Sequence, residues 1–212
     1  MRHTYYMSSL IFCAHTDDAI FSLGDYIIEN NDNNFTIAAA FAGIPKDDAG
    51  NKKHTTLRQE HADACSLINV KYINGDLLDD VYGKQNEYDL VDWIKDIVKD
   101  FDNIYIPLGI HHPDHILLSE TLLNLIDSLN KTYFIYAELP YRVAYPELYE
   151  FRFNKFKSIH NLENISINFT KNKVDAIHKY NSQVALVSNK TIIDENLIEN
   201  LVVEEKLWKV LS

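Results

Sequence analysis

Two short stretches of the sequence concentrate side chains that bind metals and move protons. The stretch His15–Asp18 holds one imidazole and two carboxylates directly after the apolar run Leu10–Ala14. The stretch His111–His115 holds three imidazoles and one carboxylate and follows the apolar run Ile104–Leu108. Crowding such groups at the end of a buried run is costly unless they have partners. A metal cation is a partner that both stretches could share.

A divalent metal site can be composed from these two stretches. Catalytic zinc typically has three imidazole and carboxylate ligands and an open position for a water molecule, whose pKa it lowers to about 7. His15, Asp18 and His115 would supply such a ligand set. Because two histidines and a carboxylate also accept iron(II), manganese or cobalt, Zn²⁺ is the first expectation and Fe²⁺ or another divalent metal the alternative.

The remaining side chains of the two stretches have the chemistry of acid–base catalysts. Asp17 is suited to take a proton from the attacking water and to pass it to a leaving group. His112 could stabilise an oxyanion on the opposite face, and Asp114 could hold His112 in the right orientation. This inventory predicts metal-assisted hydrolysis of a carbonyl compound, most naturally an amide.

A simpler interpretation applies to each stretch taken alone. An aspartate after a strand often caps the next helix, which would account for Asp17 or Asp18 and, before the following helix, for Asp114. A single histidine is more often a satisfied core or surface residue. That is the expectation for five histidines elsewhere in the chain: His3, His54, His61, His160 and His178. The metal hypothesis therefore depends on the two stretches meeting in space.

The elements that would bring them together can be predicted from the hydrophobic pattern. Strand-like runs occur at Leu10–Ala14, Phe35–Ala42, Val70–Ile73, Ile104–Leu108 and Thr132–Ala137. Helical patterns lie between them at about Ile20–Glu29, Thr55–Ile68, Tyr88–Lys99 and Ile116–Asn130. This alternation predicts an α/β fold with a mainly parallel sheet and helices on both faces. The carboxyl ends of its strands share one edge, so the two stretches converge if their strands are neighbours.

The pattern changes beyond residue 138. An aromatic stretch punctuated by prolines, Pro140–Tyr149, is followed by a possible antiparallel part near Phe151–Phe156 and Ser166–Phe169. Helical patterns close the chain at about Lys173–Ser182 and Asp194–Val210. We interpret this region as a small C-terminal rim or lid of a single domain spanning residues 1–212.

Composition excludes several classes of function. The chain has 212 residues, 46% of them hydrophobic, and a net charge of −11, which is the wrong sign for binding a phosphate backbone. The two cysteines, Cys13 and Cys65, lie in strand and helix patterns and are expected to be buried. No signal-peptide core or membrane-length apolar run is seen, so the expectation is a cytoplasmic protein with no nucleic-acid or membrane partner. Oligomerisation stays open.

The two stretches resemble the motifs of a known family, the PIG-L/LmbE-like zinc-dependent N-acetylglucosaminyl deacetylases. Ala14-His15-Thr16-Asp17-Asp18-Ala19 is similar to the family's Ala-His-Pro-Asp-Asp-Glu, and His112-Pro113-Asp114-His115 matches its His-Pro-Asp-His in full. Two weaker elements also match. These are a helix motif at Arg58-Gln59-Glu60, Ala64, Leu67 and Val70, and a late element at Lys173, Ala176, Tyr180, Ser182 and Gln183.

The resemblance implies a three-layer Rossmann-like fold and assigns roles that agree with the chemistry above. His15, Asp18 and His115 resemble the zinc ligands, Asp17 the general base, His112 the transition-state stabiliser and Asp114 its modulating neighbour. Arg58 looks like a substrate-contacting residue, and an ordinary ion pair on its own helix is the alternative. The implied substrate is an N-acetylated amino sugar or an N-acetylglucosaminyl conjugate, from which acetate is released.

A sugar also needs an apolar face on which to stack. Tyr141, Tyr145 or Tyr149 could offer one, and the alternative is that these tyrosines cover the edge of the sheet.

Two departures from the family motif leave alternatives open. Thr16 replaces a proline, which removes no functional group, whereas Ala19 replaces a glutamate and so removes a carboxylate. The same site could instead hydrolyse another N-acyl or carbamoyl amine. The protein could also be an inactive sugar-binding module that uses the metal only for binding, or the carboxylates could cap helices with no metal bound.

Overall fold

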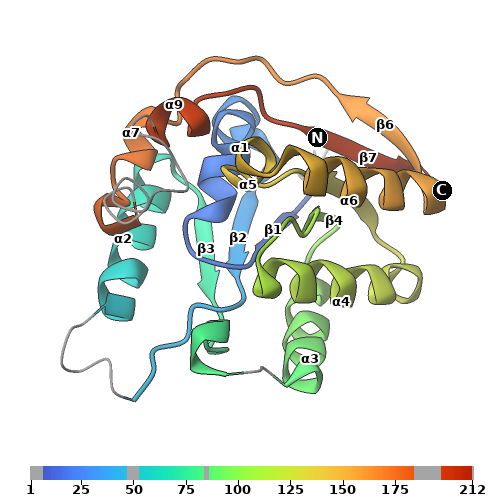
Figure 1. Ribbon diagram of the computed structural model, residues 1–212, viewed down its shortest axis with the longest axis horizontal. Helices are drawn as coiled ribbons and strands as arrows, with labels where there is room; N and C mark the ends of the chain where they lie inside the picture. Colours follow the sequence, from blue (N-terminus) through green and yellow to red (C-terminus); the bar gives the residue numbers. More distant parts are fainter. Residues whose placement is uncertain (1–6, 47–52, 84–85, 184–196, 212) are drawn as a thin grey trace, which may run out of the picture.

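A single sheet organises the molecule, and the computed structural model describes residues 7–46, 53–83, 86–183 and 197–211 of the chain. Within these residues seven strands are arranged in the order β3-β2-β1-β4-β5-β7-β6 (Figure 1). The strands are β1 (Ser9–Cys13), β2 (Phe35–Ala39), β3 (Lys71–Asn74), β4 (Asn103–Pro107), β5 (Thr132–Tyr136), β6 (Asn161–Ile165) and β7 (Leu207–Leu211). The first five strands lie where the sequence pattern predicts them.

The order of the strands confirms the condition for a shared site. β1 lies between β2 and β4 and is parallel to both, with Ser9 opposite Phe35 on one side and Asn103 on the other. The chain therefore winds outward in one direction through β2 and β3 and in the other through β4 and β5. In open α/β sheets ligands bind at such a switch point, beyond the carboxyl ends of the strands. The loops after β1 and β4 meet there.

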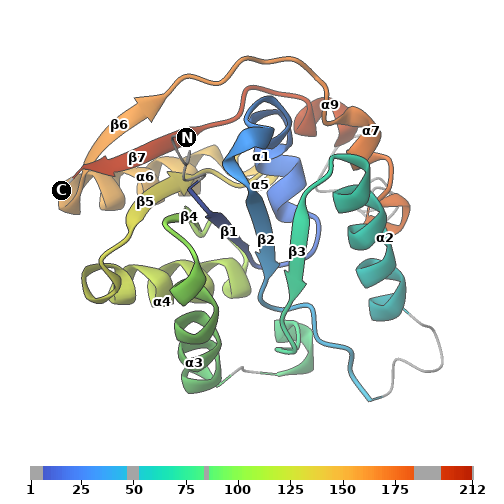
Figure 2. The same cartoon turned by 180° about the vertical axis from the view of Figure 1, so that it is seen from behind.

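Helices cover both faces of the sheet, as the βα pattern predicts (Figures 1 and 2). Alternate side chains of β1 enter different cores: Ile11 and Cys13 pack with α1 and α2, while Leu10 and Phe12 pack with α3 and α4. The longer helices are α1 (Asp18–Glu29), α2 (Lys53–Leu67), α3 (Glu87–Ile97), α4 (Pro113–Leu129) and α6 (Pro146–Ile159). The shorter ones are α5 (Tyr141–Ala144), α7 (Val174–Ile177) and α9 (Leu197–Leu201).

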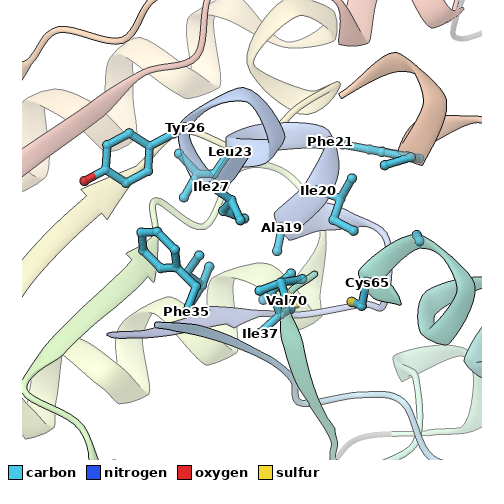
Figure 3. Close-up of a cluster of buried hydrophobic side chains, with 14 of the residues drawn as sticks. Ala19, Ile20, Phe21, Leu23, Tyr26, Ile27, Phe35, Ile37, Cys65 and Val70 are labelled. Carbon is cyan, nitrogen blue, oxygen red and sulfur yellow. The ribbon is translucent and has the colours of Figure 1, made fainter. Parts of the chain in front are cut away.

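The core between α1, α2 and the sheet is almost entirely apolar. Figure 3 shows Ala19, Ile20 and Leu23 of α1 facing Ile37 of β2 and Val70 at the end of the α2–β3 connection. Ala19 is fully buried in this cluster.

The C-terminal region differs from the sequence prediction. Phe151–Phe156, predicted as antiparallel, lies inside α6, because Phe153 and Phe156 follow the three-residue spacing of a helix face and pack against Trp208 and its neighbours. Ser166–Phe169 is not a strand either. The antiparallel pair is β6 with β7, and β7 also pairs with β5. The region thus completes the main sheet as well as forming a rim.

The predicted closing helices are also shorter than expected. Within the described part of the predicted segments, α-helix is limited to Val174–Ile177, residues 181–182 and Leu197–Leu201, and residues 194–196 lie outside the described residues. Leu207–Val210 is strand, because Leu207 and Trp208 enter the cores on opposite faces of the sheet.

A buried ion pair fastens the C-terminal segments to α1. The helix is broken at Leu23 (φ −134°, ψ 15°). Lys173 Nζ donates to the Phe21 carbonyl at 2.6 Å and to Glu205 Oε1 at 2.9 Å. The Glu205 carboxylate accepts the N–H groups of Asp25 and Tyr26 at 2.9 Å each. The break would leave backbone groups of α1 unpaired. Lys173 satisfies the carbonyl of Phe21, and Glu205 satisfies the N–H groups of Asp25 and Tyr26.

Candidate metal centre

The carboxylates of Asp17 and Asp18, which follow β1, do not cap α1. Asp17 occupies the N-cap position of α1 but makes no capping hydrogen bond through its side chain. The Asp18 carboxylate instead accepts the backbone N–H of His15 at 2.7 Å. The capping interpretation therefore does not account for either residue.

The loop after β4 has a tightly constrained backbone. Gly109 has φ +79° and His111 has φ +67°. A Cβ added at Gly109 would lie 2.7 Å from the Ser119 Cβ, so both the backbone conformation and the space require glycine. His112 is the N-cap of α4, and its Nδ1 accepts the Asp114 N–H at 3.3 Å. His115 follows one turn later and points into the site.

Three of the predicted ligand atoms form a compact triangle. His15 Nδ1 lies 3.7 Å from Asp18 Oδ2 and 3.3 Å from His115 Nε2, and the last two atoms are 3.2 Å apart. Ligand atoms held about 2.0–2.2 Å from a tetrahedral zinc ion lie roughly 3.4 Å from one another. The donor set and its spacing therefore fit a divalent cation.

The opposite nitrogen of His15 faces a second group of carboxylates. His15 Nε2 lies 3.2 Å from Asp114 Oδ2 and 3.8 Å from Asp79 Oδ2. The backbone N–H of Asp80 donates to Asp114 at 3.1 Å, and Asp80 Oδ1 lies 3.6 Å from His112 Nε2. Sequence reasoning missed Asp79 and Asp80, which stand in a segment without a motif. Asp114 contacts the predicted His112 through its backbone N–H, while its carboxylate lies on His15.

Other groupings of these side chains also lie close enough to share a cation. Ligand atoms of His15, His112 and His115 lie within 4.8 Å of one another, as do those of His15, Asp79 and Asp114, and those of Asp79, Asp80 and His112. The triangle with Asp18 is tighter than this limit and uses the most deeply buried imidazole, that of His115.

A glutamate that the sequence interpretation missed lies behind His115. Glu138 lies two residues beyond the end of β5 and is fully buried, with Oε1 3.3 Å from His115 Nδ1. The same oxygen accepts the N–H groups of Gly109 and Ile110 at 2.7 and 3.1 Å. Its only signal in the sequence is an acid directly after an apolar strand, between Ala137 and Leu139.

Burial and neighbouring charges shift the pKa values of the side chains in the site. Burial opposes the protonation of His15, but its contact with Asp114 and the charges of Asp18 and Asp79 raise its pKa to about 9. Burial raises the pKa values of Asp17 and Asp18, and it raises the pKa of Glu138 to about 7. Burial, together with the neighbouring imidazoles, lowers the pKa of His115. A bound dication would favour the carboxylate and neutral imidazole forms that ligation needs.

The comparisons with known proteins agree with the motifs. Residues 10–126, more than half of the chain, match the family PIG-L, described as GlcNAc-PI de-N-acetylase. The chain belongs to the PIG-L family. Among curated proteins no significant match is found.

Solved structures establish that the PIG-L fold extends over the whole chain. The zinc-inhibited form of teicoplanin deacetylase Orf2 has a TM-score of 0.72 at 20% identity, covering 96% of this chain and 98% of that one. N,N'-diacetylchitobiose deacetylase from Pyrococcus horikoshii has a TM-score of 0.62 at 16% identity, covering 97% and 84%. GalB, a 4-carboxy-2-hydroxymuconate hydratase from Pseudomonas putida KT2440, has a TM-score of 0.54 at 12% identity, covering 97% of both chains. The fold is therefore shared by deacetylases and at least one hydratase.

The late element around Tyr180 and Ser182 supports the turn that carries the first motif. The Tyr180 hydroxyl donates to the Thr16 carbonyl at 2.9 Å, and His61 Nδ1 lies 3.0 Å from the Tyr180 oxygen. Ser182 donates its N–H and its hydroxyl to Glu60 at 2.8 and 2.6 Å. The turn is therefore held through the backbone of Thr16, a contact that does not depend on the side chain at this position.

Arg58, the weaker PIG-L candidate, joins two loops at the same edge of the sheet. Its guanidinium donates to the carbonyls of Ala42 and Gly75 at 2.6 and 2.9 Å and to Asp76 at 2.8 Å. The ion pair is thus with a residue of the loop after β3, and not with one on its own helix. A contact between Arg58 and a substrate stays a prediction.

Aromatic side chains form one wall beside His115. The Tyr141 ring lies 4.7 Å from the His115 ring, and Tyr145 stacks on His111 with ring centroids 3.8 Å apart. Tyr149 packs instead against Phe153, away from the histidines. Of the three candidate tyrosines, Tyr141 therefore contacts an imidazole of the metal centre, whereas Tyr145 contacts the neighbouring His111.

Proposed function

We propose that this protein is a metal-dependent hydrolase that removes the acetyl group from an N-acetylated amino sugar or an N-acetylglucosaminyl conjugate. The observation that carries the proposal is the triangle of His15, Asp18 and His115, with Asp17 beside it in the turn that joins two of its members. Membership of the PIG-L family supports the reaction class. Zn²⁺ is the proposed metal, with Fe²⁺ as the alternative.

A divalent cation on these three ligands supplies Lewis-acid chemistry, activating water and polarising the acyl carbonyl. Asp17 takes a proton from the attacking water and returns it to the departing amine. Its carboxylate is half-buried, burial raises its pKa, and it makes no capping hydrogen bond to α1. His112 donates a hydrogen bond to the oxyanion from the opposite side. Asp114 holds His112 through its backbone N–H and His15 through its carboxylate.

The rim of the site indicates which sugars fit. Tyr141 offers an aromatic face next to His115 on which a sugar ring can stack. Asp79 and Asp80 face the histidines with their carboxylates, and Arg58 already pairs with Asp76. We therefore expect neutral conjugates of N-acetylglucosamine to be better substrates than phosphorylated ones, because an anionic group would meet like charge.

The loss of the family glutamate at Ala19 does not favour an inactive binding module. Ala19 is fully buried among the apolar side chains of the core between α1, α2 and the sheet (Figure 3). A glutamate there would add a charge to an apolar core. Turnover is therefore the expectation.

The test combines metal content with product release. Purified protein is analysed for bound metals and assayed for acetate and free amine with neutral N-acetylglucosamine conjugates, beside His115→Ala as the metal-free control. About one metal per chain, lost in the variant and accompanied by equimolar acetate and amine, is the expected result. Amine without acetate would redirect the activity to another acyl or carbamoyl group. A wild-type protein without metal would overturn the proposal.

A further inference from the structure

We propose that Glu138 is a positioning residue of the metal centre, which fixes the imidazole of His115 for ligation and anchors the loop that carries His112. This inference rests on the proposed function, because it concerns the same metal. Glu138 lies outside both motifs. It is not one of the proposed metal ligands and would act on the metal through His115.

The first argument is the direction of the His115 ring. Its Nδ1 lies 3.3 Å from Glu138 Oε1, and its Nε2 is the atom that faces Asp18 and His15. A carboxylate that accepts the Nδ1–H places the free lone pair on Nε2, which is the tautomer that binds a metal from that side. His115 is fully buried, so no solvent molecule could take over this role without a rearrangement of the core.

The second argument is the pairing with Asp114. Both ligand imidazoles have a carboxylate on the nitrogen that points away from the triangle: Asp114 on His15 Nε2, and Glu138 on His115 Nδ1. Carboxylate–histidine–metal arrangements of this kind orient the ring and raise the basicity of the ligand. The two histidines come from the loop after β1 and from the first turn of α4, and their carboxylates come from α4 and from the segment after β5.

The third argument is the choice of a charged group in a place where a neutral one would cost less. Glu138 Oε1 accepts three hydrogen bonds, whereas Oε2 is buried and has no hydrogen-bond partner within the described structure. A buried carboxylate without full compensation is unfavourable, and an amide would serve the N–H groups of Gly109 and Ile110 equally well. A cation on the far side of His115 explains why a carboxyl group and not an amide stands at this position.

A purely structural role makes a different prediction. If Glu138 only holds the Gly109–Ile110 loop, Glu138→Gln preserves its function, because the amide oxygen still accepts those two N–H groups. If Glu138 acts through His115, the same variant folds but binds metal more weakly. The isosteric change therefore separates the two roles.

The experiment measures Zn²⁺ affinity by competition with a chromogenic chelator for wild type, Glu138→Gln and Glu205→Gln. Glu205 is the matched control, since it is also a buried carboxylate that accepts two backbone N–H groups, but it lies at the break in α1. We expect Glu138→Gln to weaken Zn²⁺ binding by about 10- to 100-fold. Glu205→Gln should leave the affinity within about twofold of wild type while lowering the melting temperature.

A second readout follows the tautomer directly. In ¹⁵N NMR spectra of the zinc-loaded wild type, His115 should show a protonated Nδ1 and a metal-bound Nε2, and Glu138→Gln should shift the Nδ1 resonance. Equal Zn²⁺ affinity and an unchanged His115 signal in Glu138→Gln would overturn the inference and leave the deacetylase proposal standing. Wild-type protein that binds no metal would overturn both.

Discussion

The Nε2 nitrogen of His115 lies 3.2 Å from Oδ2 of Asp18, and the two residues lie in the first turns of α4 and α1, which follow different strands. This contact exists because β4 pairs directly with β1. It closes the triangle with His15, which is the cation site that we propose. The other face of His15 offers Asp79 and Asp114 instead.

Replacing Asp18 distinguishes between these two faces. We expect Asp18→Ala to remove the bound metal, because it deletes one of three ligands, whereas Asp79→Ala should retain about one metal per chain. Elemental analysis of both purified variants checks this, with circular dichroism to show that each is folded. The reverse outcome would place the metal on the Nε2 side of His15.

Asp17 is expected to be a general base and not a metal ligand. Asp17→Asn should keep wild-type metal content while lowering kcat by about 10²- to 10⁴-fold, the usual contribution of a general base. KM should change little, because the amide keeps the shape of the side chain. A variant that retains wild-type kcat would assign the proton transfer to another group, of which His112 is the nearest in role.

Much of this site could be predicted because its signals are local in the sequence. Each motif follows a recognisable strand and precedes a recognisable helix, so His15–Asp18 and His112–His115 could be placed at one edge of a parallel sheet. The alternation of strands and helices predicts that edge without coordinates. The pairing of β1 with β4, which makes the triangle possible, is a property of topology and could be stated only as a condition.

The parts that could not be predicted depend on contacts distant in sequence. Glu138 is one acid after an apolar strand, and its role appears only when β5 stands beside the β4 loop. Asp79 and Asp80 lie in an irregular connection that folds over His15 and His112. Phe151–Phe156 has enough aromatic residues for a strand, but its packing on Trp208 favours a helix. In each case tertiary contacts override a local preference.

The buried His61 should make the protein sensitive to mild acid. Burial lowers the pKa of His61 to about 4, below its usual value of about 6.5. The unfolded chain therefore binds one more proton between these pH values, and stability falls as the pH drops from 6.5 towards 4. From pH 7 to pH 5 this amounts to about 2 kcal/mol.

The variant His61→Gln isolates this effect, since glutamine does not titrate and the carboxylates common to both proteins cancel. Urea unfolding at pH 7 and pH 5 should show a loss of stability about 2 kcal/mol smaller in the variant than in wild type. The variant should also be less stable at pH 7, because the contact with Tyr180 is weakened. An equal loss in both proteins would show that His61 is protonated in the folded state.

The ion pair of Lys173 and Glu205 is expected to control stability and not metal binding. Both side chains are buried, so Lys173→Met leaves Glu205 charged and unpaired, at a cost of about 3–5 kcal/mol. Adding Glu205→Gln should recover part of this loss, because the amide oxygen still accepts an N–H of the broken α1 helix. Chemical denaturation of both single variants and the double variant gives the coupling energy. Zn²⁺ affinity is measured on the same folded variants, because α1 begins at the proposed ligand Asp18. Retained affinity would show that the ion pair supports the helix without setting the geometry of the metal ligands. A joint loss of stability and affinity would show that the break in α1 also determines that geometry.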